Sequence, residues 1–223
     1  MTEVSAKSTS EAAFKHLSAD EAQRALYIDF EGGQDQPPVL LGILGHRGKG
    51  AEPNVFQVVL DPEFERAGPE SRGLKEAIKI VVQRAEHGER RIVSWSQHDL
   101  EVVRGLRDED PELVARFERR YANALSVAKR WANKLHPEDK PPDGRLAGYL
   151  AMIAYEVPPD AEAGHVGATI RALRPRLQQG KPLTVGQKRR WGRLLTHNRY
   201  DCDGMRAVCL LATKELEIAA LEP

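Results

Sequence analysis

The sequence predicts an α/β protein in which helices pack on a mixed sheet and the C-terminal half is largely helical. Three observations lead to this fold class. Three short strand-like segments near the N-terminus are joined by turn-forming stretches, a helical segment then leads to a fourth strand, and helical patterns fill the chain from residue 111 onward. With 223 residues, the chain is long enough to bury one sizeable core.

The first three strands are predicted over residues 25–31, 39–46 and 54–60. The first and third alternate apolar with polar side chains, and the second is a short apolar run, as expected of strands. The stretches "GGQDQPP" and "GKGAEP" between them have the Gly and Pro content of turns. Because these connections are short, they favour an antiparallel three-strand meander.

The next elements alternate between helix and strand. Apolar residues recur at helical spacing over 74–88, where Gly88 can end a helix, and "RRIVSW" (90–95) is predicted to be a short buried strand. A further helix is expected from about Asp99. Beyond it, the breaks "HPEDKPPDG", "VPPD" and "QGKP" separate helices predicted over 111–135, 145–156, 165–179, 184–196 and 200–220.

The overall composition narrows the classes of protein. Residues 1–20 are polar and small, which predicts a flexible N-terminal arm or a short helix before a single domain over 21–223. No run has transmembrane length and the start lacks the apolar stretch of a secretory signal, so we expect a cytoplasmic protein with no membrane partner. Cys202 and Cys209 lie seven residues apart on a predicted helix, too far for a disulfide, and are expected to be buried free thiols.

The stretch "ALYIDFEGG" places two carboxylates on one side of a strand. Asp29 and Glu31 point the same way as Tyr27, about 7 Å apart at 3.3 Å of rise per residue. Like charges at this distance make each other harder to ionise, so the pair needs either full exposure to water or a neutralising partner. The opposite side of the strand is apolar and consists of Leu26, Ile28 and Phe30.

Two further acids occur at positions where sites often form. Asp99 comes just after the strand "IVSW", where α/β sheets commonly place functional groups. Asp201 follows His197 by four residues, so both side chains share one face if the segment is helical. Asp203 points elsewhere. Each acid also has a plainer interpretation: a solvated sheet face for Asp29 and Glu31, a helix N-cap for Asp99, and a surface carboxylate for Asp201.

A basic window precedes Asp201. Residues 163–200 contain no Asp or Glu but nine basic residues: Arg171, Arg174, Arg176, Lys181, Lys188, Arg189, Arg190, Arg193 and Arg199. In a chain with a formal net charge of zero, this grouping indicates either a polyanion-binding surface or a solvated helix face. Trp191 in the same window either stacks on a base or packs in the core. The candidate nucleic-acid contacts are Lys188, Arg189, Arg190, Arg193 and Arg199.

Three motifs in order resemble those of one nuclease family. "YIDFEGG" followed by a meander, "IVSWSQHDLEVVRGL" and "LLTHNRYDCDGMRAV" together resemble the DEDD nucleases of the ribonuclease H-like superfamily. The greatest likeness is to bacterial ribonuclease H-like domains associated with RecB-family nucleases, and it covers residues 24–215. It implies a ribonuclease H-like mixed sheet in which a parallel strand joins the antiparallel meander.

The resemblance also implies a site and a chemistry. By matching position, Asp29, Glu31, Asp99 and Asp201 would be four carboxylates that bind two Mg²⁺ or Mn²⁺ ions, with Asp29 bridging both. His197 occupies the position of the family's tyrosine, where it would orient or deprotonate the attacking water. His197 also has a plainer interpretation as a structural residue in that position.

The activity implied is 3′–5′ exonucleolytic hydrolysis of DNA or RNA, acting on a single-stranded 3′ end. Two alternatives stay open from the sequence. One is a nucleic-acid-binding module that kept the fold without catalysis, and the other is a structure-specific endonuclease using the same metals. No motif separates DNA from RNA, because recognition of the 2′-hydroxyl leaves no recognisable pattern here.

Overall fold

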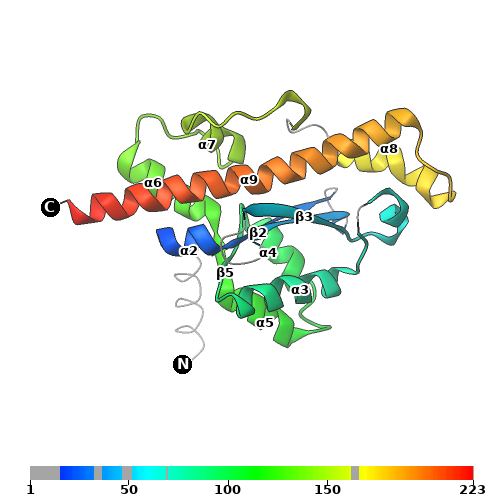
Figure 1. Ribbon diagram of the computed structural model, residues 1–223, viewed down its shortest axis with the longest axis horizontal. Helices are drawn as coiled ribbons and strands as arrows, with labels where there is room; N and C mark the ends of the chain where they lie inside the picture. The colour runs from blue at the N-terminus through cyan, green and yellow to red at the C-terminus, as the bar shows by residue number, and fades with distance from the viewer. Residues whose placement is uncertain (1–15, 33–36, 47–51, 69, 162–165, 223) are drawn as a thin grey trace.

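A five-stranded mixed sheet lies at the centre of the computed structural model, which describes residues 16–32, 37–46, 52–68, 70–161 and 166–222 (Figure 1). The strand order is β3-β2-β1-β4-β5. The antiparallel meander predicted from the turns is confirmed, and the sheet gains two parallel strands beyond it. The strands are β1 (Leu26–Glu31), β2 (Leu40–His46), β3 (Pro53–Val59), β4 (Ile92–Ser94) and β5 (Tyr121–Asn123).

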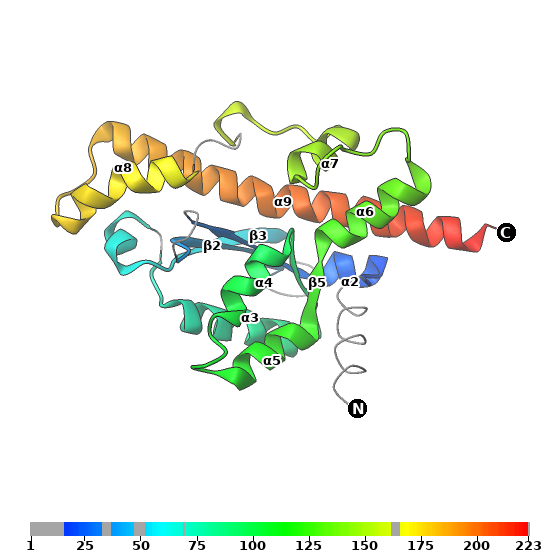
Figure 2. The same ribbon diagram turned by 180° about the vertical axis from the view of Figure 1, so that it is seen from behind.

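Helices cover both faces of the sheet (Figures 1 and 2). One face packs on α3 (Leu74–His87), α4 (Gln97–Arg104) and α5 (Pro111–Arg120). The other face packs on α9 (Val185–Leu221), which α2 (Ala19–Arg24) and α6 (Ala124–Leu135) adjoin. The remaining elements are η1 (Pro62–Ala67), α7 (Leu146–Met152), η2 (Pro159–Ala161) and α8 (Val166–Gln178).

The alternation of β1 explains how the two faces differ. Leu26, Ile28 and Phe30 belong to the core cluster shared with α3, α4 and α5. Tyr27 lies in the cluster on the α9 side, so the strand presents alternate side chains to the two layers as predicted. Asp29 and Glu31 therefore face α9.

The helix predicted over 111–135 is wrong in its middle. The chain leaves α5 at Tyr121, forms the three-residue strand β5 and re-enters helix at Ala124. Parallel pairing with β4 stabilises this short strand, and the side chain of Asn123 caps α6 by accepting a hydrogen bond from the Ser126 N–H. Three residues are too few to show a strand period, so the pattern of the two neighbouring helices hid this one.

The two last predicted helices, over 184–196 and 200–220, are a single helix. α9 runs for 37 residues without a break and lies along one side of the sheet in Figure 1. The helix predicted over 145–156 is shorter than expected, because α7 ends at Met152. The prediction that Cys202 and Cys209 are buried free thiols is confirmed.

The N-terminal segment packs closer to the body than the predicted arm over residues 1–20. Leu17 is buried, and Ser18 caps α2, whose first backbone N–H, that of Ala19, donates to Glu217 of α9. Residues 1–15 of that arm lie outside the described part of the chain. Within the described part, no helix combines the length and the apolar character needed to cross a bilayer.

Candidate functional site

Acidic side chains from three elements converge where β1 ends. Asp29 and Glu31 come from β1, and Asp201 comes from α9, which crosses above that strand. Asp99 lies in the first turn of α4, directly after β4, and β4 pairs with β1 in parallel. The charges are close enough to act on one another, because the carboxylates of Glu31, Asp201 and Asp99 all raise the pKa of Asp29.

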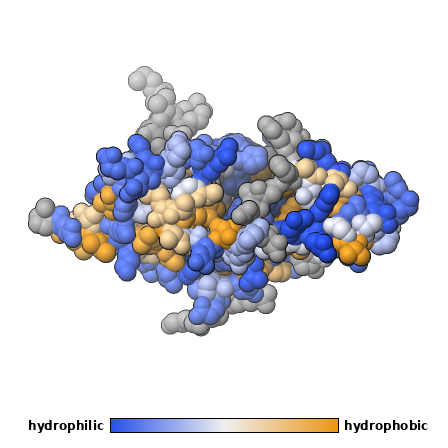
Figure 3. Space-filling model, turned by 90° about the horizontal axis from the view of Figure 1, so that it is seen from above, coloured by the Kyte–Doolittle hydropathy of each residue, from blue (hydrophilic) through white to orange (hydrophobic). Residues whose placement is uncertain are grey.

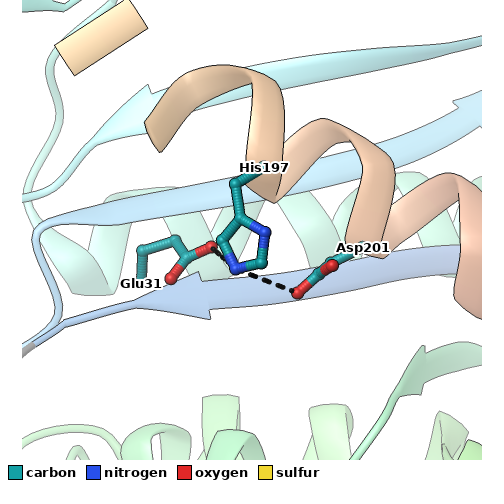
Figure 4. A group of neighbouring side chains, drawn as sticks. All are labelled: Glu31, His197 and Asp201. Carbon is teal, nitrogen blue, oxygen red and sulfur yellow. Dashed lines mark ion pairs between the residues drawn. The ribbon is translucent and has the colours of Figure 1, made fainter. Parts of the chain in front are cut away.

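The most compact part of the site consists of Glu31, His197 and Asp201 (Figure 4). The Nε2 atom of His197 lies 3.4 Å from Asp201 Oδ2 and 3.8 Å from Glu31 Oε1. One ligand atom from each of the three residues falls within 4.8 Å of the others. The predicted i, i+4 relation of His197 and Asp201 is therefore confirmed, and the sheet adds Glu31 to the pair.

A carbonyl group orients the imidazole ring. His197 Nδ1 lies 3.0 Å from the backbone oxygen of Ala161 in η2. Because a carbonyl oxygen only accepts hydrogen bonds, Nδ1 is the donor, and the neutral form of the ring would hold its lone pair on Nε2. Nε2 faces the two carboxylates, and the residue as a whole is only 9% exposed. The arrangement is the one that a metal-binding or proton-accepting histidine needs.

A buried atom without a donor indicates what the site is built to hold. Glu31 is 6% exposed, and no hydrogen-bond donor among the described residues reaches its Oε1 atom. Leaving a buried carboxylate oxygen unpaired is costly, so such groups normally meet a cation or a donor. The surrounding atoms are carboxylate oxygens and an imidazole nitrogen, which are ligands for a divalent cation. Glu31, His197 and Asp201 thus offer a set of ligands that could hold a metal ion, and the identity and number of ions stay predictions.

Burial and mutual repulsion disfavour ionisation of these acids. Loss of water raises the pKa of Glu31 to about 8, and the nearby charge of Asp201 adds to the effect. Burial also raises the pKa of Asp201 to about 6, which His197 partly opposes. The pKa of Asp29 is raised well above its ordinary value, chiefly by burial. A bound cation would reverse this by favouring the charged forms.

Asp99 is placed in the site region but outside its compact part. It is 5% exposed, and burial raises its pKa, while hydrogen bonds from Ser96, Phe30 and Ser94 lower it. Ser96 caps α4 by accepting from the His98 N–H, so the interpretation of Asp99 as that helix's N-cap is wrong. Asp99 is therefore a buried acid beside the paired acids of β1.

Sequence reasoning missed a buried amide network that holds Asp29. The Asn198 Nδ2 atom donates to Asp29 Oδ2 at 2.8 Å and to the Asp29 backbone oxygen at 3.1 Å. Gln57 Nε2 in turn donates to Asn198 Oδ1 at 2.9 Å and to the Leu195 backbone oxygen at 2.7 Å. Asn198 is fully buried, so its polar atoms depend on these partners.

A glycine makes room for this network. Gly42 in β2 pairs with Asp29 on one side and with Gln57 on the other, so the three residues form a row across the sheet. A Cβ atom on Gly42 would lie 2.3 Å from Asn198 Oδ1. The available sequence signal was this glycine inside an apolar strand, which often marks a close approach of another group.

The five candidate nucleic-acid contacts are exposed residues of α9. None of them has a carboxylate oxygen within 4 Å among the described residues; they are Lys188, Arg189, Arg190, Arg193 and Arg199. Arg174, from the same basic window, instead pairs with Asp61 at 2.9 Å and with Glu63. The base-stacking interpretation of Trp191 is unsupported, because its ring is buried 5.5 Å from that of Phe64.

Comparison of the chain with protein-family models, with curated proteins and with solved structures found no match. The strands and helices themselves define the fold class, which is α/β with a five-stranded mixed sheet. Its assignment to the ribonuclease H-like superfamily stays a prediction. Function is inferred from the residues of the site and their surroundings.

We predict that Gly42→Ala destabilises the protein by about 1–3 kcal/mol, because the added methyl group displaces the buried Asn198 side chain. Gly192→Ala is the matched control, since a Cβ there meets nothing within 4 Å and lies in a helix. The control should hold or gain stability, by up to about 1 kcal/mol. Urea unfolding of both variants tests this, and equal losses would contradict the assigned role of Gly42.

We also predict an unusual pH dependence of the metal-free protein. Because the folded-state pKa of Glu31 is about 8 and its ordinary value is 4.5, the folded state binds more protons between these limits. Stability should therefore fall as pH rises through this window. In chelator, wild type should lose more unfolding free energy between pH 5.5 and 8 than Glu31→Gln, by at least about 1.4 kcal/mol, the value of one pKa unit. Parallel pH profiles would contradict the raised pKa.

Proposed function

We propose that this chain is a metal-dependent nuclease with a ribonuclease H-like fold that hydrolyses phosphodiester bonds of DNA or RNA. The observation that carries the proposal is the convergence of four acids from β1, α4 and α9 around a buried Glu31 oxygen that no donor among the described residues reaches. Concentrating carboxylates in this way is destabilising unless cations neutralise them. Carboxylate-bound metal pairs are a recurrent solution for phosphoryl-group hydrolysis.

The placement of the acids supports the proposed superfamily. The resemblance implies an acidic pair on the first strand, one acid after the fourth strand and one on a late helix. Asp29 and Glu31 lie on β1 at the centre of the sheet, Asp99 follows β4 beside it, and Asp201 lies on the last helix. The sheet order β3-β2-β1-β4-β5, antiparallel then parallel, agrees with the mixed sheet that this resemblance implies.

Asp29, Glu31, Asp99 and Asp201 are the residues that would hold Mg²⁺ or Mn²⁺, and two ions are expected from the resemblance. When bound, the ions neutralise the acids and lower the pKa of a water molecule. Asn198 keeps the Asp29 carboxylate in one orientation through its two hydrogen bonds, so that ligand needs little reorganisation.

His197 is proposed to act on the attacking water. Its Nε2 lone pair faces Glu31 and Asp201 and is free to accept a hydrogen bond or a proton. Attack by the water oxygen on phosphorus breaks the bond to the 3′ oxygen, the water proton passes to Nε2, and the leaving oxygen takes a proton from solvent. The Ala161 carbonyl stabilises the resulting imidazolium by accepting from Nδ1.

The function is tested with 5′-labelled single-stranded DNA and RNA in Mn²⁺, in Mg²⁺ and in excess chelator. A 3′–5′ exonuclease produces a ladder only when metal is present, whereas an endonuclease produces discrete cuts and a binding module produces none. Asp201→Asn should reduce the rate at least about 100-fold. Asp203→Asn, the same change two residues later on the opposite side of α9, should cleave like wild type. Cleavage in chelator would overturn the metal requirement.

A second prediction concerns His197. His197→Ala should lower the single-turnover rate by about 10²–10⁴-fold, the usual size of a lost acid–base group. The Mn²⁺ concentration needed for half-maximal rate should change little, because the acids hold the metals. A large rise in that concentration would instead make His197 a metal ligand. A wild-type rate would leave it a structural residue.

A further inference from the structure

Four of the five candidate basic residues of α9 fall into two groups by the direction in which they point, and Arg189, rotated by about 80° from His197, belongs to neither. Successive helical residues are rotated by about 100° around the axis. Relative to His197, Arg190 is therefore rotated by about 20° and Arg193 by about 40°, whereas Lys188 and Arg199 are rotated by about 160–180°. Arg193 and Arg190 thus continue the face of His197 toward the start of the helix, at roughly 6 and 10.5 Å of rise.

These two arginines are free to bind something outside the protein. Both are exposed, and among the described residues neither has a carboxylate oxygen within 4 Å. In Figure 3 hydrophilic residues predominate at the end of the molecule where α8 lies beside the start of α9. Arg174 of α8 shows the contrast, because Asp61 and Glu63 neutralise it.

The helix segment that carries the arginines is anchored by two neighbouring side chains of α9. Trp191 and Leu194 are buried against Phe64 and α8, so this part of α9 is anchored while Arg190 and Arg193 face outward. Because α9 is one unbroken helix, the positions of both arginines relative to His197 and Asp201 are set by helix geometry. A ligand held by the row is therefore aligned with the acidic site.

We propose that Arg193 and Arg190 bind successive backbone phosphates of a single nucleic-acid strand that enters the acidic site, an inference that rests on the proposed function. Guanidinium groups match the geometry of phosphate. Phosphate also binds the metal cations that the nearby acidic site is proposed to hold. The row is one residue wide, which suits one backbone. A duplex would present two backbones, whereas Lys188 and Arg199 lie on the opposite side of α9 from the row.

The salt dependence of binding tests the row without requiring cleavage. Fluorescence anisotropy of a labelled 15-nucleotide oligothymidylate is measured in chelator between 50 and 400 mM salt. Each lost phosphate contact on a single strand flattens the slope of log affinity against log salt by about 0.7, so Arg190→Ala/Arg193→Ala should flatten it by about 1.4. Affinity at 50 mM salt should fall at least about tenfold.

Two double variants remove the same charge elsewhere. Arg130→Ala/Lys134→Ala on α6, where both residues are exposed, should keep the wild-type slope. Lys188→Ala/Arg199→Ala, on the opposite face of α9, should flatten the slope by clearly less than the Arg190/Arg193 variant. An unchanged slope for Arg190→Ala/Arg193→Ala, or equal effects of all three variants, would contradict the proposal that Arg190 and Arg193 bind backbone phosphates.

The same assay with a 15-base-pair duplex tests the choice of a single strand. The duplex should bind more weakly than the oligothymidylate and lose less affinity in Arg190→Ala/Arg193→Ala, and an equal loss would overturn that choice. Failure of the proposed function is a separate result. If the protein binds oligothymidylate with the expected slopes but does not cleave it in Mn²⁺, the proposed phosphate contacts of Arg190 and Arg193 stand and the nuclease assignment is wrong.

Discussion

The packing of α9 against the sheet at Gly42 is the contact on which the site depends. The helix approaches the meander closely because β2 has no side chain there, and Asn198 fills the space. The same residue bonds Asp29 and accepts from Gln57, so three elements are joined by one buried amide. This contact sets the depth at which His197 and Asp201 meet Glu31. A side chain at position 42 would displace the Asn198 side chain that joins α9 to β1.

The close packing creates an electrostatic cost that a bound cation would offset. Burial raises the pKa of Glu31 to about 8, and the nearby charge of Asp201 adds to the effect. Among the described residues, no donor reaches the Oε1 atom of Glu31. A structure selected for stability alone would replace such a residue or pair it. Active sites commonly retain this kind of local destabilisation because the ligand relieves it. Stability and the proposed function therefore oppose each other at Glu31, and the proposed metal binding would reconcile them.

The length of α9 connects features that lie far apart. Its start packs with α8 and η1, its middle supplies His197 and Asp201, and its end carries Glu217, which accepts from α2. Because α9 has no loop within it, the relative positions of side chains several turns apart on it are fixed. The proposed phosphate contacts and the proposed chemical site would then share one frame, which is how positioning contributes to catalysis.

The local periodicity of the sequence was sufficient to predict the features that depend on residues close together in the chain. The two-residue period of β1 places Asp29 and Glu31 on one side, and the helical period brings His197 beside Asp201, because both relations are set by backbone geometry. The partners of those residues were decided by contacts between segments far apart in the chain. Asn198 meets Asp29 across 169 positions, and no local pattern encodes that pairing.

The short strand β5 exists because β4 offers an edge to pair with, and α9 stays unbroken because the sheet and α8 support it along its length. The residues of the basic window cannot be told apart in the sequence. In the structure, helix rotation points them in different directions, and Asp61 and Glu63 neutralise Arg174. Charge pairing depends on distance in space and not on order along the chain.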